Sequence, residues 1–155
     1  MLLRALVACI ALGACTSLPR QSENLEREAR NFMAGYARDL LAGDRDAIVG
    51  RYDPNGAYMV GRGAKTFASA EEIRVRYGQP SWRAPARFQW CDLSFEVTGP
   101  STILVTGRFE WSPPAGPILL GSYTSLLARG DRGLRIRVEH EDFAAADGPT
   151  PPCSP

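Results

Sequence analysis

The second half of the sequence contains four strand-length stretches without proline, and they constrain the fold more than any other feature. Turn residues separate them: Gly-Pro at 99–100, a Pro- and Gly-rich run at 113–117, and a loop at 130–133 with glycine at both ends. Proline is excluded from sheet interiors because it cannot donate to the hydrogen-bond ladder. Turns at such short intervals predict an antiparallel meander. The expected strands are residues 86–98, 102–112, 118–129 and 134–143.

The residues before these stretches show helical periodicity. Apolar side chains recur every three or four positions, which indicates one stripe of an amphipathic helix. They are Leu25, Ala29, Phe32, Tyr36 and Leu40. Gly43 suits the position just after a helix end, and Asp44 can cap a second helix over residues 44–52. Ser69 and Glu72 are spaced as a capping box, which predicts the start of a third helix.

Helices followed by strands favour an α+β layer packing. We expect three N-terminal helices packed on a curved antiparallel sheet of four long strands plus a short one at 57–60. Gly107 and Gly121 lie within predicted strands, at positions typical of bulges and sharp curvature.

The alternation of side chains predicts which residues of the last strand face the interior. The apolar residues of 134–138 share one face, and His140 continues that face. We therefore expect His140 to point inward, and Glu139 and Glu141 to lie on the outer face.

The first 14 residues have the layout of an export signal, with an early charge at Arg4, an apolar run and then small residues. The run is shorter than the roughly 20 residues that a membrane-spanning helix needs. It ends in Leu12-Gly13-Ala14-Cys15, which resembles the bacterial lipobox. The resemblance implies cleavage before Cys15 and acylation of that residue, so that the protein is anchored in the lipid bilayer. A plain secretory signal is the alternative.

The residue after Cys15 is Thr16. By resemblance to enterobacterial sorting rules, the absence of Asp at this position favours the outer membrane, with the protein facing the periplasm. We interpret residues 15–22 as the lipidated cysteine and a tether, and residues 23–143 as one domain. The proline content of residues 144–155 is typical of a flexible tail.

Two cysteines remain in the mature domain and tail, Cys91 and Cys153. An oxidising compartment permits a disulfide between them, which would join the tail to the sheet. Alternatively, Cys91 is a small buried hydrophobic residue and Cys153 an unpaired thiol. The sequence leaves both interpretations open.

Composition excludes several function classes. The chain has 18 basic and 17 acidic residues, whereas nucleic-acid binding needs a basic surplus to neutralise phosphates. Its single histidine excludes zinc centres that need two or more. No phosphate-binding or dinucleotide-binding motif is present. We therefore expect no metal, no cofactor and no nucleic-acid partner.

The order of the predicted elements resembles the cone-shaped fold of nuclear transport factor 2 and ketosteroid isomerase, particularly the SnoaL-like group. Ala-Gly-Asp-Arg-Asp-Ala-Ile at 42–48 is similar to that group's joint between two helices. Residues 121–124 and 134–140 resemble its last two strands. The resemblance implies a cone-shaped α+β barrel. It does not imply one activity, because this fold hosts isomerases, dehydratases, cyclases and binding modules.

Isomerases of this family use a tyrosine on the first helix, an aspartate base after the second helix and a protonated aspartate on a late strand. Abstraction of a proton next to a carbonyl needs such a base together with a hydrogen-bond donor for the oxyanion. Tyr36 matches the tyrosine, but the base position falls near Val60 and the second acid near Thr124. The resemblance therefore argues against ketosteroid isomerase activity in this chain.

The side chains expected in the cavity of the cone are Tyr36, Trp111, Thr124, His140 and Asp142. His140 is either a general base oriented by Asp142 or a structural histidine. The first hypothesis is a membrane-anchored envelope lipoprotein whose domain binds a small apolar ligand or a protein partner without catalysis. The alternative is a SnoaL-like dehydratase, isomerase or hydrolase that uses His140 with Asp142 and Tyr36. A homodimer through the open face of the sheet is a further expected partnership.

Overall fold

The computed structural model describes residues 17–61, 63–143 and Cys153. The predicted signal peptide, Cys15 and the rest of the predicted tail lie outside these residues. The elements in chain order are α1 (Ser17–Ala42), α2 (Arg45–Val49), β1 (Ala57–Gly61), β2 (Ala64–Ala68), α3 (Ala70–Gly78), β3 (Arg87–Trp90), β4 (Ser94–Gly99), β5 (Thr102–Ser112), β6 (Leu119–Gly130) and β7 (Gly133–Phe143). Within the described residues, no helix is both long enough and apolar enough to cross a bilayer.

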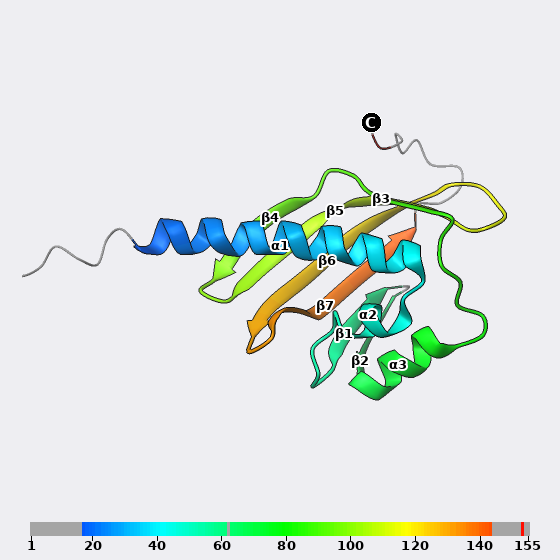
Figure 1. The fold of residues 1–155 in the computed structure, drawn as a ribbon, viewed down its shortest axis with the longest axis horizontal. Helices are drawn as coiled ribbons and strands as arrows, with labels where there is room; N and C mark the ends of the chain where they lie inside the picture. Colours follow the sequence, from blue (N-terminus) through cyan, green and yellow to red (C-terminus); the bar gives the residue numbers. More distant parts are fainter. Residues whose placement is uncertain (1–16, 62, 144–152, 154–155) are drawn as a thin grey trace, which may run out of the picture.

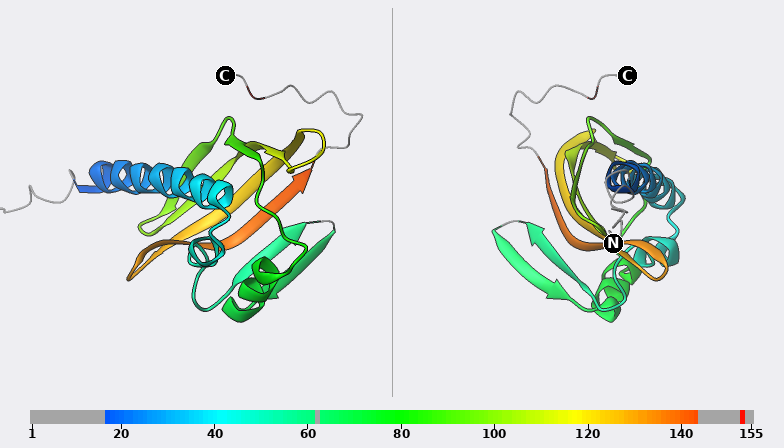
Figure 2. Two further views of the ribbon diagram at one scale, coloured as in Figure 1. Left: turned by 45° about the vertical axis from the view of Figure 1, so that its right-hand side comes forward. Right: turned by 90° about the vertical axis from the view of Figure 1, so that its left-hand side faces the viewer.

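Helix α1 lies across a curved sheet, while α2, α3 and the β1–β2 hairpin gather at one end (Figure 1). The end-on view in Figure 2 shows the sheet bending around one side of the helix. The predicted fold class, three helices on a curved sheet, is confirmed in this respect.

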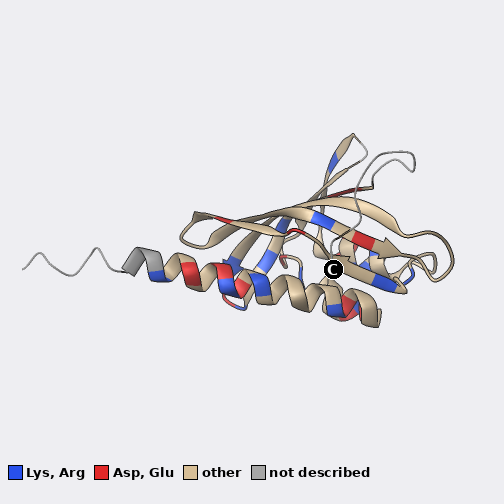
Figure 3. Cartoon of the chain, turned by 90° about the horizontal axis from the view of Figure 1, so that it is seen from above, with Lys and Arg blue, Asp and Glu red and all other residues tan. Residues whose placement is uncertain are grey.

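Helix α1 forms because its apolar stripe covers the sheet. All five residues of the predicted stripe are buried, including Tyr36 and Leu40. The exposed side carries both charge signs (Figure 3), and Glu26 and Arg30 form an ion pair of 2.6 Å one turn apart. The helix begins at Ser17, so residues 17–22 of the segment interpreted as a tether are helical.

The predicted caps set the ends of the helices. Gly43 follows α1 with a φ of 65°, a conformation that glycine adopts without steric cost. The Asp44 carboxylate accepts a hydrogen bond of 3.0 Å from the Ala47 backbone N–H, which starts α2. Ser69 and Glu72 form the complete capping box of α3. Helix α2 ends at Val49, short of the predicted end at residue 52.

The sheet contains seven strands in the order β2-β1-β7-β6-β5-β3, with β4 also paired to β5. The observed sheet differs in detail from the predicted one of four long antiparallel strands plus a short one. Residues 64–68 form an additional strand, β2, and β1 runs parallel to β7.

The predicted strand over residues 86–98 is divided into β3 and β4. The backbone turns at residues 91–93, where the Leu93 N–H donates to the Cys91 carbonyl over 2.8 Å. A side chain on Gly107 of β5 would lie 2.8 Å from a Leu93 methyl carbon. The absence of a side chain at Gly107 therefore allows this turn to pack closely against β5.

A β-bulge lies in β7 at Arg137. Leu127 of β6 pairs with Ile136, but the preceding residue of β6 pairs with Val138, so Arg137 has no partner in the ladder. Its guanidinium instead forms an ion pair of 3.0 Å with Asp53, in the loop before β1. The sequence favoured bulges at Gly107 and Gly121, but the register between β5 and β6 shows no shift at either residue.

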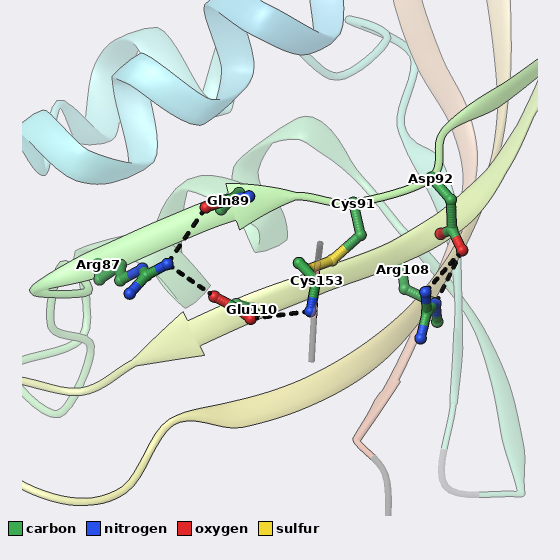
Figure 4. The surroundings of a disulfide bond; sticks show 7 residues. All are labelled: Arg87, Gln89, Cys91, Asp92, Arg108, Glu110 and Cys153. Carbon is green, nitrogen blue, oxygen red and sulfur yellow. Dashed lines mark hydrogen bonds and ion pairs between the residues drawn. A yellow bond between two sulfur atoms is a disulfide. The ribbon is translucent and has the colours of Figure 1, made fainter. Parts of the chain in front are cut away.

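A disulfide joins Cys91 to Cys153, whose Cα atoms are 5.3 Å apart. Figure 4 shows Cys153 against the face of β3 and β5, with Glu110 beside it. The Cys153 backbone N–H donates to the Glu110 carboxylate over 3.1 Å, and Arg87 lies 3.2 Å from the same carboxylate. Of the two interpretations that the sequence left open, the structure contains the paired one.

Candidate functional site

The bulge at Arg137 decides which β7 side chains face the interior. Side chains alternate between the faces of a strand, so one unpaired extra residue reverses the alternation beyond it. Ile136 is buried before the bulge. After the bulge, Glu139 and Glu141 share the interior face, where Glu141 pairs with the buried Tyr123 of β6.

The faces expected for His140 and the two glutamates are therefore wrong. His140 pairs with Thr124 of β6 and with Val60 of β1, on the face opposite Glu139. The expectation assumed unbroken alternation from residue 134 to residue 140, and the bulge breaks it. His140 and Thr124 consequently point away from the interior.

Glu139 is surrounded by tyrosine hydroxyls. Its side chain is 2% exposed. The Tyr36 and Tyr123 hydroxyls donate to Oε1 over 3.3 and 3.2 Å, and the Tyr52 hydroxyl donates to Oε2 over 2.5 Å. The Tyr77 hydroxyl joins the cluster at 2.8 Å from Tyr52. Helix α1, the turn after α2, helix α3 and strand β6 each contribute one of these tyrosines.

The tyrosines remain hydrogen-bond donors because their environment opposes ionisation. Burial is the largest cause that raises the pKa of Tyr36, Tyr52 and Tyr123, and the nearby carboxylate of Glu139 raises each pKa further. Three such bonds to the Glu139 carboxylate offset part of the cost of burying its charge.

The two glutamates share one environment but differ in their partners. Burial raises the pKa of Glu139, while hydrogen bonds from Tyr52 and Tyr123 act in the opposite direction. Burial, followed by the charge of Glu139, raises the pKa of Glu141 to about 8, and Arg76 opposes that rise. Since this value lies above neutral pH, Glu141 is mostly protonated at pH 7.

Both glutamates line a cavity of about 450 Å³ near the end of β7. Its walls come from the β1–β2 hairpin, from β7 and from Arg76 of α3. Arg76, Glu139, Glu141, Asp142 and Thr66 supply polar groups. The remaining lining residues are Met59, Val60, Gly61, Ala64, Ala68 and Phe143.

The structure does not bring the five predicted pocket residues together. Tyr36 reaches Glu139, and Asp142 borders the cavity. Trp111 lies further along the sheet, with its ring 6.1 Å from that of Phe88. Thr124 and His140 occupy the opposite face of the sheet, so the predicted trio of His140, Asp142 and Tyr36 does not form.

Sequence reasoning missed the two glutamates and Arg76. The expected acid positions near Val60 and Thr124 do lack acids, but Glu139 and Glu141 bring carboxyl groups to the interior. A usable signal was present in the tyrosines, because a buried phenol needs a hydrogen-bond partner. Tyr36 belongs to the predicted core stripe and so implies a buried acceptor, for which Glu139 and Glu141 of β7 are candidates.

No protein-family model matches the sequence, and no curated protein matches it. Solved structures match in fold. A protein of unknown function from Shewanella oneidensis, described as NTF2-like, has a TM-score of 0.67 at 15% identity, covering 75% of this chain and 97% of that one. An NTF2-like protein with a cystatin-like fold from Novosphingobium aromaticivorans has a TM-score of 0.65 at 17% identity, covering 89% and 94%.

A proposed scytalone dehydratase from the same species has a TM-score of 0.66 at 9% identity, covering 88% of this chain and 96% of that one. These likenesses define the class of structure: the chain has the cone-shaped NTF2-like fold. The resemblance inferred from the sequence is confirmed at the level of the fold.

Proposed function

We propose that the domain binds a small, largely apolar ligand in the cavity between β7, the β1–β2 hairpin and α3. The observation that carries this proposal is a cavity of about 450 Å³ lined by two polar groups without partners. Among the described residues, neither the Glu141 carboxyl nor the Arg76 guanidinium has a hydrogen bond or an ion pair. The volume falls within the range of small-molecule sites, and a few polar groups in an apolar wall are typical of them.

Filling the cavity tests this proposal. Ala64 lines the cavity, whereas the ammonium group of Lys65, the next residue of β2, lies 5.3 Å from the Tyr58 ring on the other face of the hairpin. We expect Ala64→Phe to abolish ligand binding and Lys65→Phe to preserve it. Native mass spectrometry of the purified protein would detect ligands retained by each variant. Equal ligand occupancy in both variants would exclude this cavity as the site.

We further propose that acylated Cys15 anchors the domain in the bacterial envelope, at the outer membrane and facing the periplasm. The lipobox-like sequence that ends at Cys15 supports this location, and two or three acyl chains would hold the protein stably. Cys15→Ser should move the protein from the membrane fraction to the soluble periplasmic fraction. A variant that stays in the membrane pellet would contradict the anchor.

A second candidate function is acid–base catalysis, favoured by two carboxyl groups on one face of β7. A glutamate with a pKa of about 8 exchanges protons readily near neutral pH. The test is deuterium incorporation next to the carbonyl of cyclohexanone at pH 8, followed by NMR. Catalysis predicts a rate above buffer that Glu141→Gln removes. A wild-type rate equal to that of buffer would exclude proton abstraction from this ketone.

A further inference from the structure

The cavity has an electrostatic character that narrows the choice of ligand. Arg76 is exposed at the end of α3 and lines the cavity. Its charge lowers the pKa of both glutamates, which places it close to them. The described residues include no carboxylate within ion-pair distance of Arg76. The guanidinium is therefore available to an anion that enters the cavity.

Glu139 and Glu141 repel such an anion less strongly than two free carboxylates would. Both oxygens of Glu139 already accept hydrogen bonds, from three phenols in total. Glu141 is mostly protonated at neutral pH and can donate to an acceptor. Apart from the Asp142 carboxylate near the end of the strand, the polar lining groups that remain for a ligand are donors: the Glu141 carboxyl, the Arg76 guanidinium and the Thr66 hydroxyl.

We propose that this cavity binds a carboxylate head group between the Arg76 guanidinium and the Glu141 carboxyl, with a short apolar body against the hairpin. This inference rests on the proposed ligand-binding function and assigns its ligand class. A guanidinium matches the planar geometry of a carboxylate, and a carboxylic acid donates a short, charge-assisted bond to it. Met59, Ala68 and Phe143 supply apolar surface to the body.

The head group should bind in a pH-dependent manner. Titratable and charged groups surround Glu141. They are Glu139 and Asp142 on its own strand, Arg76 and Tyr77 on α3, Tyr123 on β6, Tyr36 on α1 and Tyr52 after α2. The cavity-lining residues of β1 and β2 carry no charge. Above a pH of about 8, Glu141 ionises, loses its donor and repels the carboxylate. Affinity should then fall by about tenfold per pH unit.

Three probes with the same eight-carbon chain but different head groups test the assignment: octanoate, octanol and octylamine. Isothermal titration calorimetry with the full mature domain at pH 6.5 should show the tightest binding for octanoate. Between pH 6.5 and pH 9.5, the affinity for octanoate should fall by at least tenfold, while that for octanol should change little. Octanoate is ionised throughout this range, so the change reports on the protein.

Two variants assign the roles of the residues. Glu141→Gln keeps a neutral donor, so it should bind octanoate at pH 6.5 and lose the alkaline decrease. Arg76→Met should weaken octanoate binding about ten- to hundredfold, as expected for a hydrogen-bonded charge pair, and spare octanol. Arg74→Met is the matched control, because Arg74 lies on the same helix and pairs with Glu71 outside the cavity.

The outcomes separate this inference from the proposed function. Binding of octanol or octylamine at least as tight as that of octanoate would overturn the head-group assignment and leave a small-ligand site in place. An Arg76→Met variant that binds octanoate like Arg74→Met would also overturn it. If none of the probes binds to wild type, and the Ala64→Phe variant retains the same native ligand, both proposals fail.

Discussion

Replacing Glu141 by glutamine should make the protein more stable at alkaline pH. Folding places this carboxyl in the interior, where burial and the charge of Glu139 raise its pKa from 4.5 to about 8. An acid with a raised pKa favours the unfolded state once it can ionise there, because the unfolded chain releases the proton more readily. Its contribution to stability is complete below pH 4.5 and is lost as pH rises through 8.

The expected magnitude follows from the size of the shift. A rise from 4.5 to about 8 corresponds to roughly 5 kcal/mol when no screening acts. Glu141 lines a cavity large enough for water, which lowers the cost of its charge. We therefore expect wild type to lose about 2 kcal/mol more than Glu141→Gln between pH 5 and pH 9.

Urea unfolding at pH 5, 6, 7, 8 and 9 measures this difference in the free energy of unfolding. The Glu96→Gln control removes an exposed glutamate on β4, and its pH profile should run parallel to that of wild type. The reasoning is refuted if Glu141→Gln also runs parallel to wild type. That result would mean that Glu141 ionises equally well in the folded and unfolded chains.

Three further changes test the packing around the site. Tyr52→Phe removes the 2.5 Å hydrogen bond to the buried carboxylate and should cost about 1–3 kcal/mol in urea unfolding, whereas Tyr58→Phe, at an exposed ring, should cost little. Cys153→Ser opens a disulfide between residues 62 positions apart; we expect a loss of about 4 kcal/mol, seen as a lower Tm only under non-reducing conditions. Gly121→Ala would press a methyl group into an aromatic ring of β5 and should cost about 1–3 kcal/mol. Gly130→Ala, which meets open space, should differ from wild type by less than about 1 kcal/mol in the same assay.

The sequence allowed the fold to be predicted because its local signals agree with its packing. The stripe that includes Tyr36 marked α1, and the capping box at Ser69 marked the start of α3. Prolines and glycines marked the ends of β5, β6 and β7. These signals depend on neighbouring residues along the chain, and each is readable without knowledge of the tertiary structure.

The candidate site was not predictable in the same way, because long-range contacts determine it. The bulge at Arg137 is associated with an ion pair to Asp53, far away in the sequence. Nothing in residues 134–141 alone signals the break in alternation. His140 was consequently placed in the interior, where Glu139 and Glu141 lie instead.

Strand β2 was missed for a related reason. Most of its side chains are exposed, so it lacks the apolar alternation that marks the longer strands. Its backbone pairs with β1 from Ala57–Ala68 to Gly61–Ala64, and this hairpin forms one wall of the cavity. A strand defined by backbone pairing gives a weak signal in the order of its side chains.

Because of the bulge, the orientation of the Glu139 and Glu141 side chains does not depend on the number of residues before them in β7. Their orientation follows from their partners on β6, since Ser125 faces Glu139 and Tyr123 faces Glu141. Removal of Arg137 would make the pairing with β6 continuous from Ile136 to Val138 and leave both of those pairs unchanged. Positions compared across neighbouring strands will therefore identify the equivalent acids in distant relatives better than positions counted along the chain.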